Sequence, residues 1–349
     1  MEREIRTVDS PKGEITVVRL TNNKGAWVEL SSMGAGIIGV GVPDRNGKIE
    51  NVALGYANPA DYVEDGPCMG KIPGRYANRI AKGTFSIDGE TYRLAINNGP
   101  NALHGGSTGF HKRIWNVSYI PNGVRFTYES ADGEEGYPGK LKARADYVWS
   151  SNNVLNLYLT AETDKPTVVN LTNHAYWNLK GSAAGSVLDH TLKLKAHHWL
   201  PTDETLIPTG EIAPVEGTPM DFTEAKALGK DIKADFPALR YGKGYDNCFV
   251  IDGWRKGFFT DKAVVLEEKE SGRVLEIGTT QPGLQVYTGN WLAGSPLNHE
   301  GRSYQDYEGV AIEMQGFPDA PNKPQFPSQL LVPGERYDEQ IRFTFKVKE

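Results

Sequence analysis

An alternation of apolar and polar residues with a period of two runs through this chain and constrains its fold more than any other feature. In residues 140–147 every second residue is apolar, and residues 155–159 and 341–347 repeat the pattern. A period of two is typical of a β-strand with one buried and one solvated face. Turn-forming pairs lie between the apolar runs, at Asn46-Gly47, Asp88-Gly89, Asn122-Gly123 and Ser271-Gly272. The pattern predicts many short strands joined by tight turns.

Helix is expected in only one place. Residues 221–228 can form two helical turns, closed by Gly229. Predicted strands do not alternate with predicted helices, which argues against a parallel, doubly wound sheet. Short strands with Gly- and Pro-rich loops favour a β-sandwich or barrel. Because no repeat, low-complexity stretch or linker divides the chain, we expect a single domain over residues 1–349.

The distribution of charge bears on possible partners. The formal net charge is -6, and the Lys and Arg residues are scattered without a basic run. Proteins that bind nucleic acid usually concentrate positive charge to neutralise phosphates. We therefore expect a small neutral or polar ligand and no nucleic acid.

The cysteines and the N-terminus bear on location. Cys68 and Cys248 are far apart and lack CxxC spacing, which predicts two reduced, buried thiols in place of a zinc site or a disulfide. Residues 1–6 lack the apolar stretch of a signal peptide. No run reaches the roughly 18 apolar residues that a membrane helix needs. We expect a cytoplasmic protein that does not enter a membrane.

A polar row lies within the predicted strand between Val169 and Leu179. Amide, imidazole and phenol groups suit a cleft for a hydroxylated ligand, whereas a strand facing water usually carries Lys, Glu and Thr. A hydrogen-bonded core histidine on an ordinary strand explains the pattern equally well. The row consists of Asn170, Thr172, His174, Tyr176 and Asn178.

Two further strands show polar residues on one face. In residues 310–317, Glu313 and Gln315 lie opposite an apolar face. A Glu in such a run should be partly buried, which raises its pKa and suits it to general base catalysis; an ion pair with Arg on a solvated face is the alternative. Residues 281–291 place Gln285, Tyr287 and Trp291 on one side, where aromatic rings can stack on a sugar, although an edge strand would look similar.

Loops supply further candidates. His104 stands in a Gly-rich turn, Arg79 lies beside Asn78, and Asp246 follows a Gly-Lys-Gly turn. His104 and His174 lack the spacing of zinc ligands, so no metal site is expected. The remaining histidines are expected at the surface or in packing: His111, His190, His197, His198 and His299.

Six segments, in this order, resemble the aldose 1-epimerase (galactose mutarotase) family. The likeness runs from about Gly34 to the C-terminus, and six blocks with compatible spacing are far more specific than any one of them. Two positions depart from the commoner family pattern, Tyr76 and Asn247. The matching segments are GRYANRI at 74–80, NALHGG at 101–106, NLTNHAYWNL at 170–179, YD at 245–246, PGLQVYTGN at 282–290 and EMQGFPDAPN at 313–322.

The resemblance implies a fold and an activity. The family fold is all-β, a large antiparallel β-sandwich (a galactose mutarotase-like supersandwich) with little helix. The activity is interconversion of the α and β anomers of free hexoses such as galactose and glucose. It uses a His as general acid and a Glu as general base, without a metal or an organic cofactor. A free aldohexose is the implied partner, and we expect a monomer or weak homodimer.

The resemblance also assigns roles to residues. By position, His174 is the acid and Glu313 the base, with His104 as a further catalytic residue. The sugar-binding residues would be Asn78, Arg79, His104, Tyr176, Asp246 and Gln285.

Three alternatives remain at the level of sequence. A non-catalytic sugar-binding protein on the same fold would not need an acid and a base. A glycoside hydrolase would need paired carboxylates, for which Asp246 is the only evident partner of Glu313. An epimerase for phosphorylated hexoses would need more basic residues near the cleft than Arg75 and Arg79.

Overall fold

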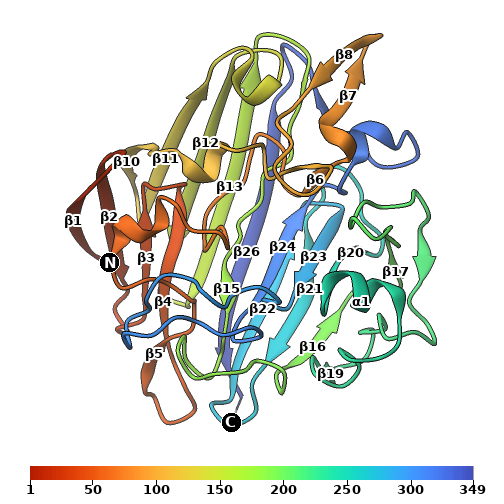
Figure 1. Ribbon diagram of the computed structural model, residues 1–349. Coiled ribbons are helices and arrows are strands. Elements are labelled where there is room, and N and C mark those ends of the chain that lie inside the picture. Colours follow the sequence, from red (N-terminus) through yellow and green to blue (C-terminus); the bar gives the residue numbers. More distant parts are fainter. Residues whose placement is uncertain (349) are drawn as a thin grey trace.

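The computed structural model describes residues 1–348 and consists mainly of antiparallel β-sheet. The largest sheet has nine strands (Figure 1). Its order is β10 (Asn116–Ile120), β11 (Gly123–Ser130), β12 (Leu141–Trp149), β13 (Val154–Thr163), β26 (Tyr337–Val347), β22 (Arg273–Thr279), β21 (Thr260–Glu267), β16 (Thr191–Leu194) and β19 (Lys226–Ala227).

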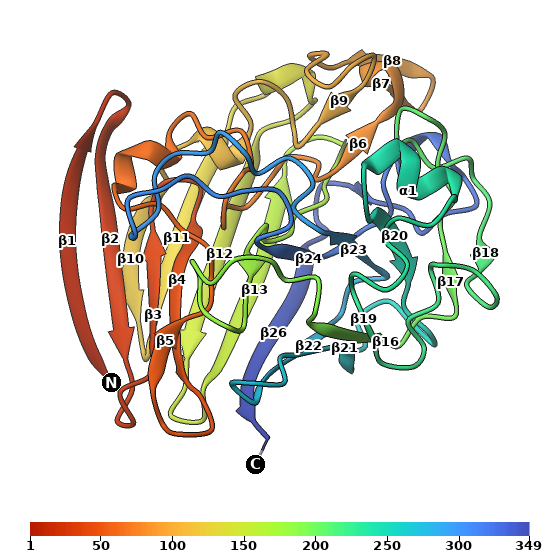
Figure 2. The same ribbon diagram turned by 60° about the horizontal axis from the view of Figure 1, so that its bottom comes forward.

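Two further sheets form the second layer. A five-stranded sheet has the order β1 (Glu2–Ser10), β2 (Gly13–Thr21), β3 (Trp27–Ser31), β4 (Gly36–Pro43) and β5 (Ile49–Asn51). A six-stranded sheet has the order β15 (Tyr176–Trp177), β24 (Val310–Gln315), β23 (Gly283–Tyr287), β20 (Asp246–Val250), β17 (His198–Trp199) and β18 (Ala213–Pro214). Figure 2 shows both sheets beside the nine-stranded sheet.

Short elements complete the chain. The two-stranded pairs are β6 (Arg79–Ile80) with β9 (Ala102–Leu103), β7 (Thr84–Ile87) with β8 (Glu90–Arg93), and β14 (Thr167–Val168) with β25 (Leu330–Leu331). Within residues 1–348 the only α-helix is α1 (Pro237–Gly242), and none is long and apolar enough to cross a membrane. The 3-10 turns are η1 (Pro59–Tyr62), η2 (Ala81–Gly83), η3 (Phe110–Lys112), η4 (Glu134–Gly136) and η5 (Ala320–Asn322).

The core lies between the two layers. The predicted alternation is confirmed in β12, β13 and β26, whose apolar rows are buried against the second layer. Tyr147 donates a hydrogen bond to Ala35 O in the five-stranded sheet region, 2.7 Å away, while Trp177 of the six-stranded sheet packs on Phe343 and Phe345. Both smaller sheets therefore cover one face of the large sheet, and the predicted all-β antiparallel sandwich with little helix is confirmed.

The four predicted turns are also confirmed, because each lies between two paired antiparallel strands. Their glycines or the residues before them have positive φ, as at Asp88 (50°) and Gly89 (84°). Positive φ at both central residues matches the twist of a tight hairpin.

The predicted helix at 221–228 is wrong. Asp221 accepts hydrogen bonds from the backbone N–H and the hydroxyl of Thr223, at 3.0 and 2.6 Å, which is a local turn that competes with helix. Phe222 is buried in the core, and the end of the segment forms β19, which pairs with β16. Tertiary packing and the Asp221 turn together override the helical propensity of this segment.

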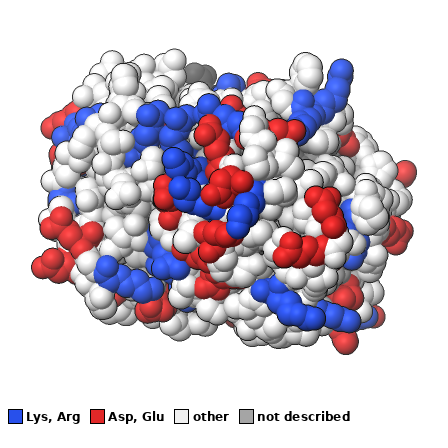
Figure 3. Space-filling view, turned by 90° about the horizontal axis from the view of Figure 1, so that it is seen from above, with Lys and Arg blue, Asp and Glu red and all other residues white. Residues whose placement is uncertain are grey.

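Charges of both signs are interspersed on the face that Figure 3 shows. This agrees with the scattered Lys and Arg of the sequence.

Leu157 tests the core between the layers. It is fully buried on β13, a central strand of the large sheet. We expect Leu157→Ala to lower the free energy of unfolding by about 2–5 kcal/mol, because it removes apolar contacts and leaves a cavity. Exposed Glu162 on the same strand is the control, and Glu162→Ala should change the value by less than about 0.5 kcal/mol. Urea denaturation measures both; equal effects would contradict this account of the core.

Candidate active site

The polar segment at 169–179 is not one continuous strand. Only Tyr176–Trp177 forms regular strand within it, and the segment is buried on both sides. The amide of Asn170 donates to Ala77 O at 3.1 Å and that of Asn178 to Glu308 O at 3.0 Å, so these side chains fasten neighbouring loops. The predicted row in a cleft is therefore correct for His174 and Tyr176 and wrong for Asn170, Thr172 and Asn178.

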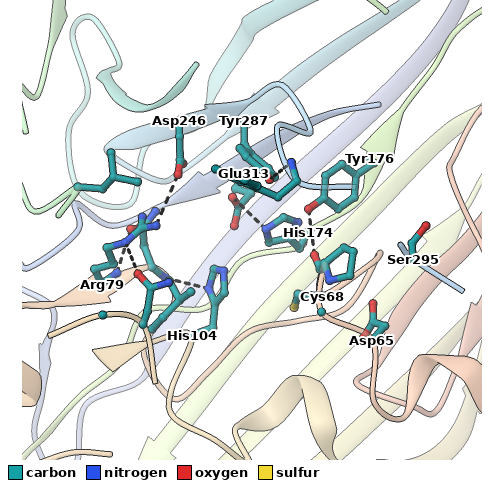
Figure 4. Close-up of a pocket in the computed structure, with 18 of the residues that line it drawn as sticks. Asp65, Cys68, Arg79, His104, His174, Tyr176, Asp246, Tyr287, Ser295 and Glu313 are labelled. Carbon is teal, nitrogen blue, oxygen red and sulfur yellow. Dashed lines mark hydrogen bonds and ion pairs between the residues drawn. The ribbon is translucent and has the colours of Figure 1, made fainter. Parts of the chain in front are cut away.

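A cavity of about 940 Å³ opens at the face of the six-stranded sheet (Figure 4). Of the predicted site residues, the ones that line it are Asn78, Arg79, His104, His174, Tyr176, Asp246 and Glu313. They come from five separate parts of the chain. The structure thus brings together nearly the whole predicted set.

His174 and Glu313 meet in the wall of this cavity. The register that pairs Tyr176 of β15 with Ala311 of β24 continues to His174, whose Nε2 lies 3.5 Å from Glu313 Oε1. The two residues are only 4% and 2% exposed. Within residues 1–348, His174 Nδ1 and Glu313 Oε2 have no hydrogen-bond partner. Both atoms are buried, so each lies in the wall with its hydrogen-bonding capacity unused.

Burial fixes the protonation of this pair. Desolvation raises the pKa of Glu313 well above its ordinary value, with the charge of Asp246 adding to the effect and that of Arg79 opposing it. Desolvation also lowers the pKa of His174 to about 4. Both shifts favour the uncharged form of the pair, in which the pair holds one proton and that proton is on Glu313.

His104 is oriented as a hydrogen-bond donor. The backbone N–H of Asn78 donates to His104 Nδ1 at 3.1 Å, so the ring proton is on Nε2. The ring lies edge-on to His174, with 5.3 Å between centroids. Burial, and then the neighbouring His174, lower the pKa of His104 well below its ordinary value, which keeps it neutral. His104 can therefore donate from Nε2 without being charged.

Pairing of β6 with β9 brings Arg79 and His104 to one side of the cavity, since Arg79 pairs with Leu103. The turn that follows requires Gly105, which has φ of 83° and lies so close to Gly74 that a Cβ would stand 1.8 Å from Gly74 O. The glycine that follows His104 therefore allows the tight turn that holds His104 at the cavity.

Asp246 is held between two partners. Arg79 Nη2 lies 3.6 Å from Asp246 Oδ2, and Gln285 Nε2 donates to Asp246 Oδ1 at 2.7 Å. Arg79 Nε also donates to Asn98 Oδ1 at 3.0 Å. Gln285 itself is not among the described residues that line the cavity and lies behind Asp246. Its direct contact with sugar stays a prediction, whereas its contact with Asp246 is observed.

The other basic residue and the two departures from the family pattern lie behind the wall. Buried Arg75 donates to Pro138 O and Gly139 O at 2.8 and 2.9 Å. The hydroxyl of Tyr76 donates to Phe317 O at 2.9 Å, and Asn247 Oδ1 accepts from the backbone of Asp246 at 3.3 Å. Among the residues described, none of these three lines the cavity.

Two aromatic residues predicted to lie on one face with Gln285 also line the wall. Tyr287 lies across from Asp246 on the neighbouring strand. Trp291 stands at the rim, 66% exposed, beneath the ammonium group of Lys243 at 4.3 Å. Sequence reasoning missed Asn98 and the loops at 64–68, 204–206 and 293–296, which line the cavity but have no periodic signal.

The two cysteines are free and buried, and Cys68 lines the cavity. No group of three or more His, Cys, Asp or Glu side chains within residues 1–348 could hold a metal ion. The remaining histidines lie in packing or at the surface, as expected; His111 and His190 are buried, whereas His197, His198 and His299 are exposed.

A buried ion pair anchors the loop at 64–68. Asp65 and Lys71 form this pair with both side chains fully buried. Lys71 Nζ also donates to Tyr62 O at 2.6 Å, and Asp65 accepts from the backbone of Met69 at 2.7 Å. Tyr176 donates to Pro67 O at 2.9 Å, which ties the same loop to the cavity wall.

Asp65→Asn tests this anchor. It leaves Lys71 as a buried charge without its partner, so we expect the free energy of unfolding to fall by about 3–5 kcal/mol. Because the loop lines the cavity, binding of a ligand in the cavity should weaken as well. The control is the neighbouring Glu64→Gln, whose exposed ion pairs with Lys12 and Lys112 contribute at most about 1 kcal/mol. Similar losses in both variants, measured by urea denaturation, would contradict the anchoring role.

The sequence and the structure both have close counterparts. A family model described as aldose 1-epimerase matches residues 16–344. Human galactose mutarotase is 45% identical over 320 residues, which are 92% of this chain and 91% of that protein. The aldose 1-epimerase of Escherichia coli K12 is 37% identical over 340 residues, 96% of this chain and 97% of that protein.

Two solved structures share the fold. An aldose epimerase homologue from C. elegans has a TM-score of 0.87 at 30% identity, covering 99% of this chain and 100% of the other. Galactose 1-epimerase from Lactobacillus acidophilus has a TM-score of 0.86 at 27% identity, with both chains covered in full.

Proposed function

The chain belongs to the aldose 1-epimerase family and is an aldose 1-epimerase, and from this premise we propose that His174 and Glu313 are its acid and base. The proposed substrates are free aldohexoses such as galactose and glucose. One observation carries the assignment, the 3.5 Å contact between His174 Nε2 and Glu313 Oε1 inside a buried cavity wall. Two groups this close can flank the C1 hydroxyl and the ring oxygen of one sugar.

The reaction is a balanced exchange of protons. Glu313 takes the proton of the C1 hydroxyl, and the O–H electron pair forms the carbonyl at C1. The bond between C1 and the ring oxygen breaks, and the ring oxygen takes its electron pair and a proton from His174. The aldehyde then turns about C1–C2, and reclosure on the other face runs the same transfers in reverse.

Burial of the pair assists ring opening. To start ring opening, Glu313 must be a carboxylate and His174 an imidazolium. This charged form holds one proton in total, the same number as the uncharged form, so one is converted to the other by moving the proton from Glu313 to His174. Ring opening moves a proton to Glu313 and takes one from His174, so it returns the pair to its uncharged form. Because desolvation favours uncharged groups, the cavity favours this step.

Other residues of the wall are proposed to hold the sugar. Arg79 and Asp246 offer a donor and an acceptor for neighbouring hydroxyls, and Asn78 an amide. His104 offers its Nε2–H as a further donor, which supports its predicted place beside the acid and base. The hydroxyl of Tyr176 is used by Pro67 O, so Tyr176 presents its ring to the sugar.

Glu313→Gln and His174→Gln test the assignment. We expect each to lower kcat by about 10²–10⁴-fold, with KM changed little, since each removes one proton transfer but keeps the shape of the site. Polarimetry of freshly dissolved α-D-galactose measures the rate above the spontaneous reaction.

Glu339→Gln is the matched control for Glu313. Burial raises the pKa of Glu339 to about 7, but this residue bonds to Thr280 and is not among the described residues at the cavity. Its variant should keep wild-type kcat. Full activity in Glu313→Gln or His174→Gln would refute the assignment, and no acceleration by the wild-type protein would favour a non-catalytic sugar-binding role.

The pH dependence follows from the pair. Below about pH 4 His174 takes up a second proton while Glu313 keeps its own, so no proton acceptor remains. Above the raised pKa of Glu313 the pair loses its only proton, so no donor remains. We expect log(kcat/KM) to stay level between these limits and to fall on the acid side near pH 4. An acid inflection near the ordinary histidine value of about 6.5 would contradict the one-proton pair.

A further inference from the structure

A second polar layer lies directly behind His174 and Glu313. Continuing the register of β15 and β24 by two residues beyond that pair places Thr172 beside Gln315. The two segments stay side by side beyond this point, because the backbone N–H of Gly316 donates to Asn170 Oδ1 at 2.8 Å. Thr172 and Gln315 thus lie between two observed contacts.

This layer is buried but its polar atoms are not satisfied. Both residues are 0% exposed. Thr172 Oγ1 and both amide atoms of Gln315 have no hydrogen-bond partner within residues 1–348. A buried polar group without a partner destabilises the folded protein, so such groups are rare and usually have a functional reason. By contrast, the neighbouring Asn170 makes hydrogen bonds with both its amide atoms.

Apolar side chains close one side of Gln315. Its partner on β23 is Gly283, where an added Cβ would lie 3.0 Å from Cys248 Sγ and 2.9 Å from the ring of Phe317. Gln315 and Glu313 project from the same face of β24, because alternate residues of a strand do. On this side, β24 carries one other polar atom without a partner, Glu313 Oε2, and the paired strand β23 carries Gln285 Oε1, which accepts and cannot donate.

We infer that Gln315, with Thr172, is a positioning element that stabilises the carboxylate of Glu313 during catalysis. As the proton moves from Glu313 Oε1 to His174 Nε2, the electron pair stays on the carboxylate. The amide N–H of Gln315 then donates to Glu313 Oε2, and the hydroxyl of Thr172 donates to the Gln315 carbonyl. Neither residue touches the sugar. This inference rests on the proposed roles of Glu313 and His174.

The titratable groups that face Glu313 are contributed by several elements. They are His174, Tyr176, Arg79, Asp246, Cys68 and Cys248. Of these, Cys248 also interacts with Gln315, which lowers the pKa of its thiol, but burial has the larger effect and raises that pKa. The thiol of Cys248 therefore stays uncharged when Gln315 is replaced, and a shift in the pH profile of a Gln315 variant reports on the carboxylate of Glu313.

Gln315→Met keeps the size of the side chain and removes both polar atoms. We expect kcat to fall by about 10- to 100-fold, the effect of losing one hydrogen bond to a charged group. KM should stay within about threefold of the wild-type value, because sugar contacts are unchanged. The alkaline limb of the pH profile should move to higher pH, because a less stabilised carboxylate keeps its proton longer. The melting temperature should equal or exceed that of the wild type.

Gln281→Met is the matched control. Gln281 is also fully buried and its Oε1 also lacks a partner, but its Nε2 donates to Leu171 O and to the hydroxyl of Tyr337, at 3.3 and 2.7 Å. This variant should lose stability and keep the wild-type kcat and alkaline limb. Thr172→Val should lower kcat as Gln315→Met does, and Thr172→Ser should retain it, which keeps the test valid if one variant folds poorly.

Two outcomes would overturn the inference. One is a wild-type kcat and alkaline limb in Gln315→Met, and the other is an equal loss of kcat in Gln315→Met and Gln281→Met. Either result leaves the proposed function intact as long as Glu313→Gln and His174→Gln are inactive. Full activity in those two variants would instead reject the proposed function.

Discussion

The site depends on one constraint: the side chains of His174 and Glu313 share a proton while both are buried away from water. A pair that is 4% and 2% exposed can hold charge only while something compensates it, and the cavity supplies such groups in Arg79 and in any bound sugar hydroxyls. The sheet meets the geometric side of this constraint. Glu313 lies on β24, between β15 and β23, so strands on both sides fix its position. A strand holds Glu313, the proposed base, 3.5 Å from His174 more accurately than a loop could.

Much of the fold could be predicted from the sequence, because the strands of the large sheet have one apolar face and therefore alternate apolar and polar residues. Leu155, Leu157 and Leu159 alternate along β13, and they are buried as that alternation predicts. The same rule fails at 169–179, where both sides are buried and side-chain amides replace strand pairing by bonding to loop carbonyls. It fails again at 221–228, where the Asp221 turn and the burial of Phe222 decide the backbone. Periodicity predicts strands and helices that have one buried and one solvated face, and neither of these two segments has such faces.

The candidate site was predictable mainly through family resemblance, since its residues come from segments far apart in the chain. Patterning alone indicated that Glu313 would be buried with a raised pKa, and the structure agrees. It could not place Asp65, because an acidic residue in a loop gives no sign that Lys71 will be buried against it. Nor could it separate Gln285, which supports Asp246 from behind, from residues on the cavity wall itself. These distinctions depend on which side of a wall a side chain lies, which only the packed structure specifies.

The polar side chains around the cavity differ in how far their hydrogen bonds are satisfied. Asn170 and Asn178 are bonded to backbone atoms and hold the cavity's surroundings in place. Polar atoms without partners among the residues described lie on Thr172, His174, Gln285, Glu313 and Gln315, and others lie behind the site on Trp177, Asn247 and Gln281. Unpaired buried groups lower stability, and for the first set, partners acquired during the proposed reaction, from the sugar or from one another, would offset this cost. These unpaired groups lower the stability of the empty site. The same groups can stabilise the charges that arise only during the proposed proton transfer.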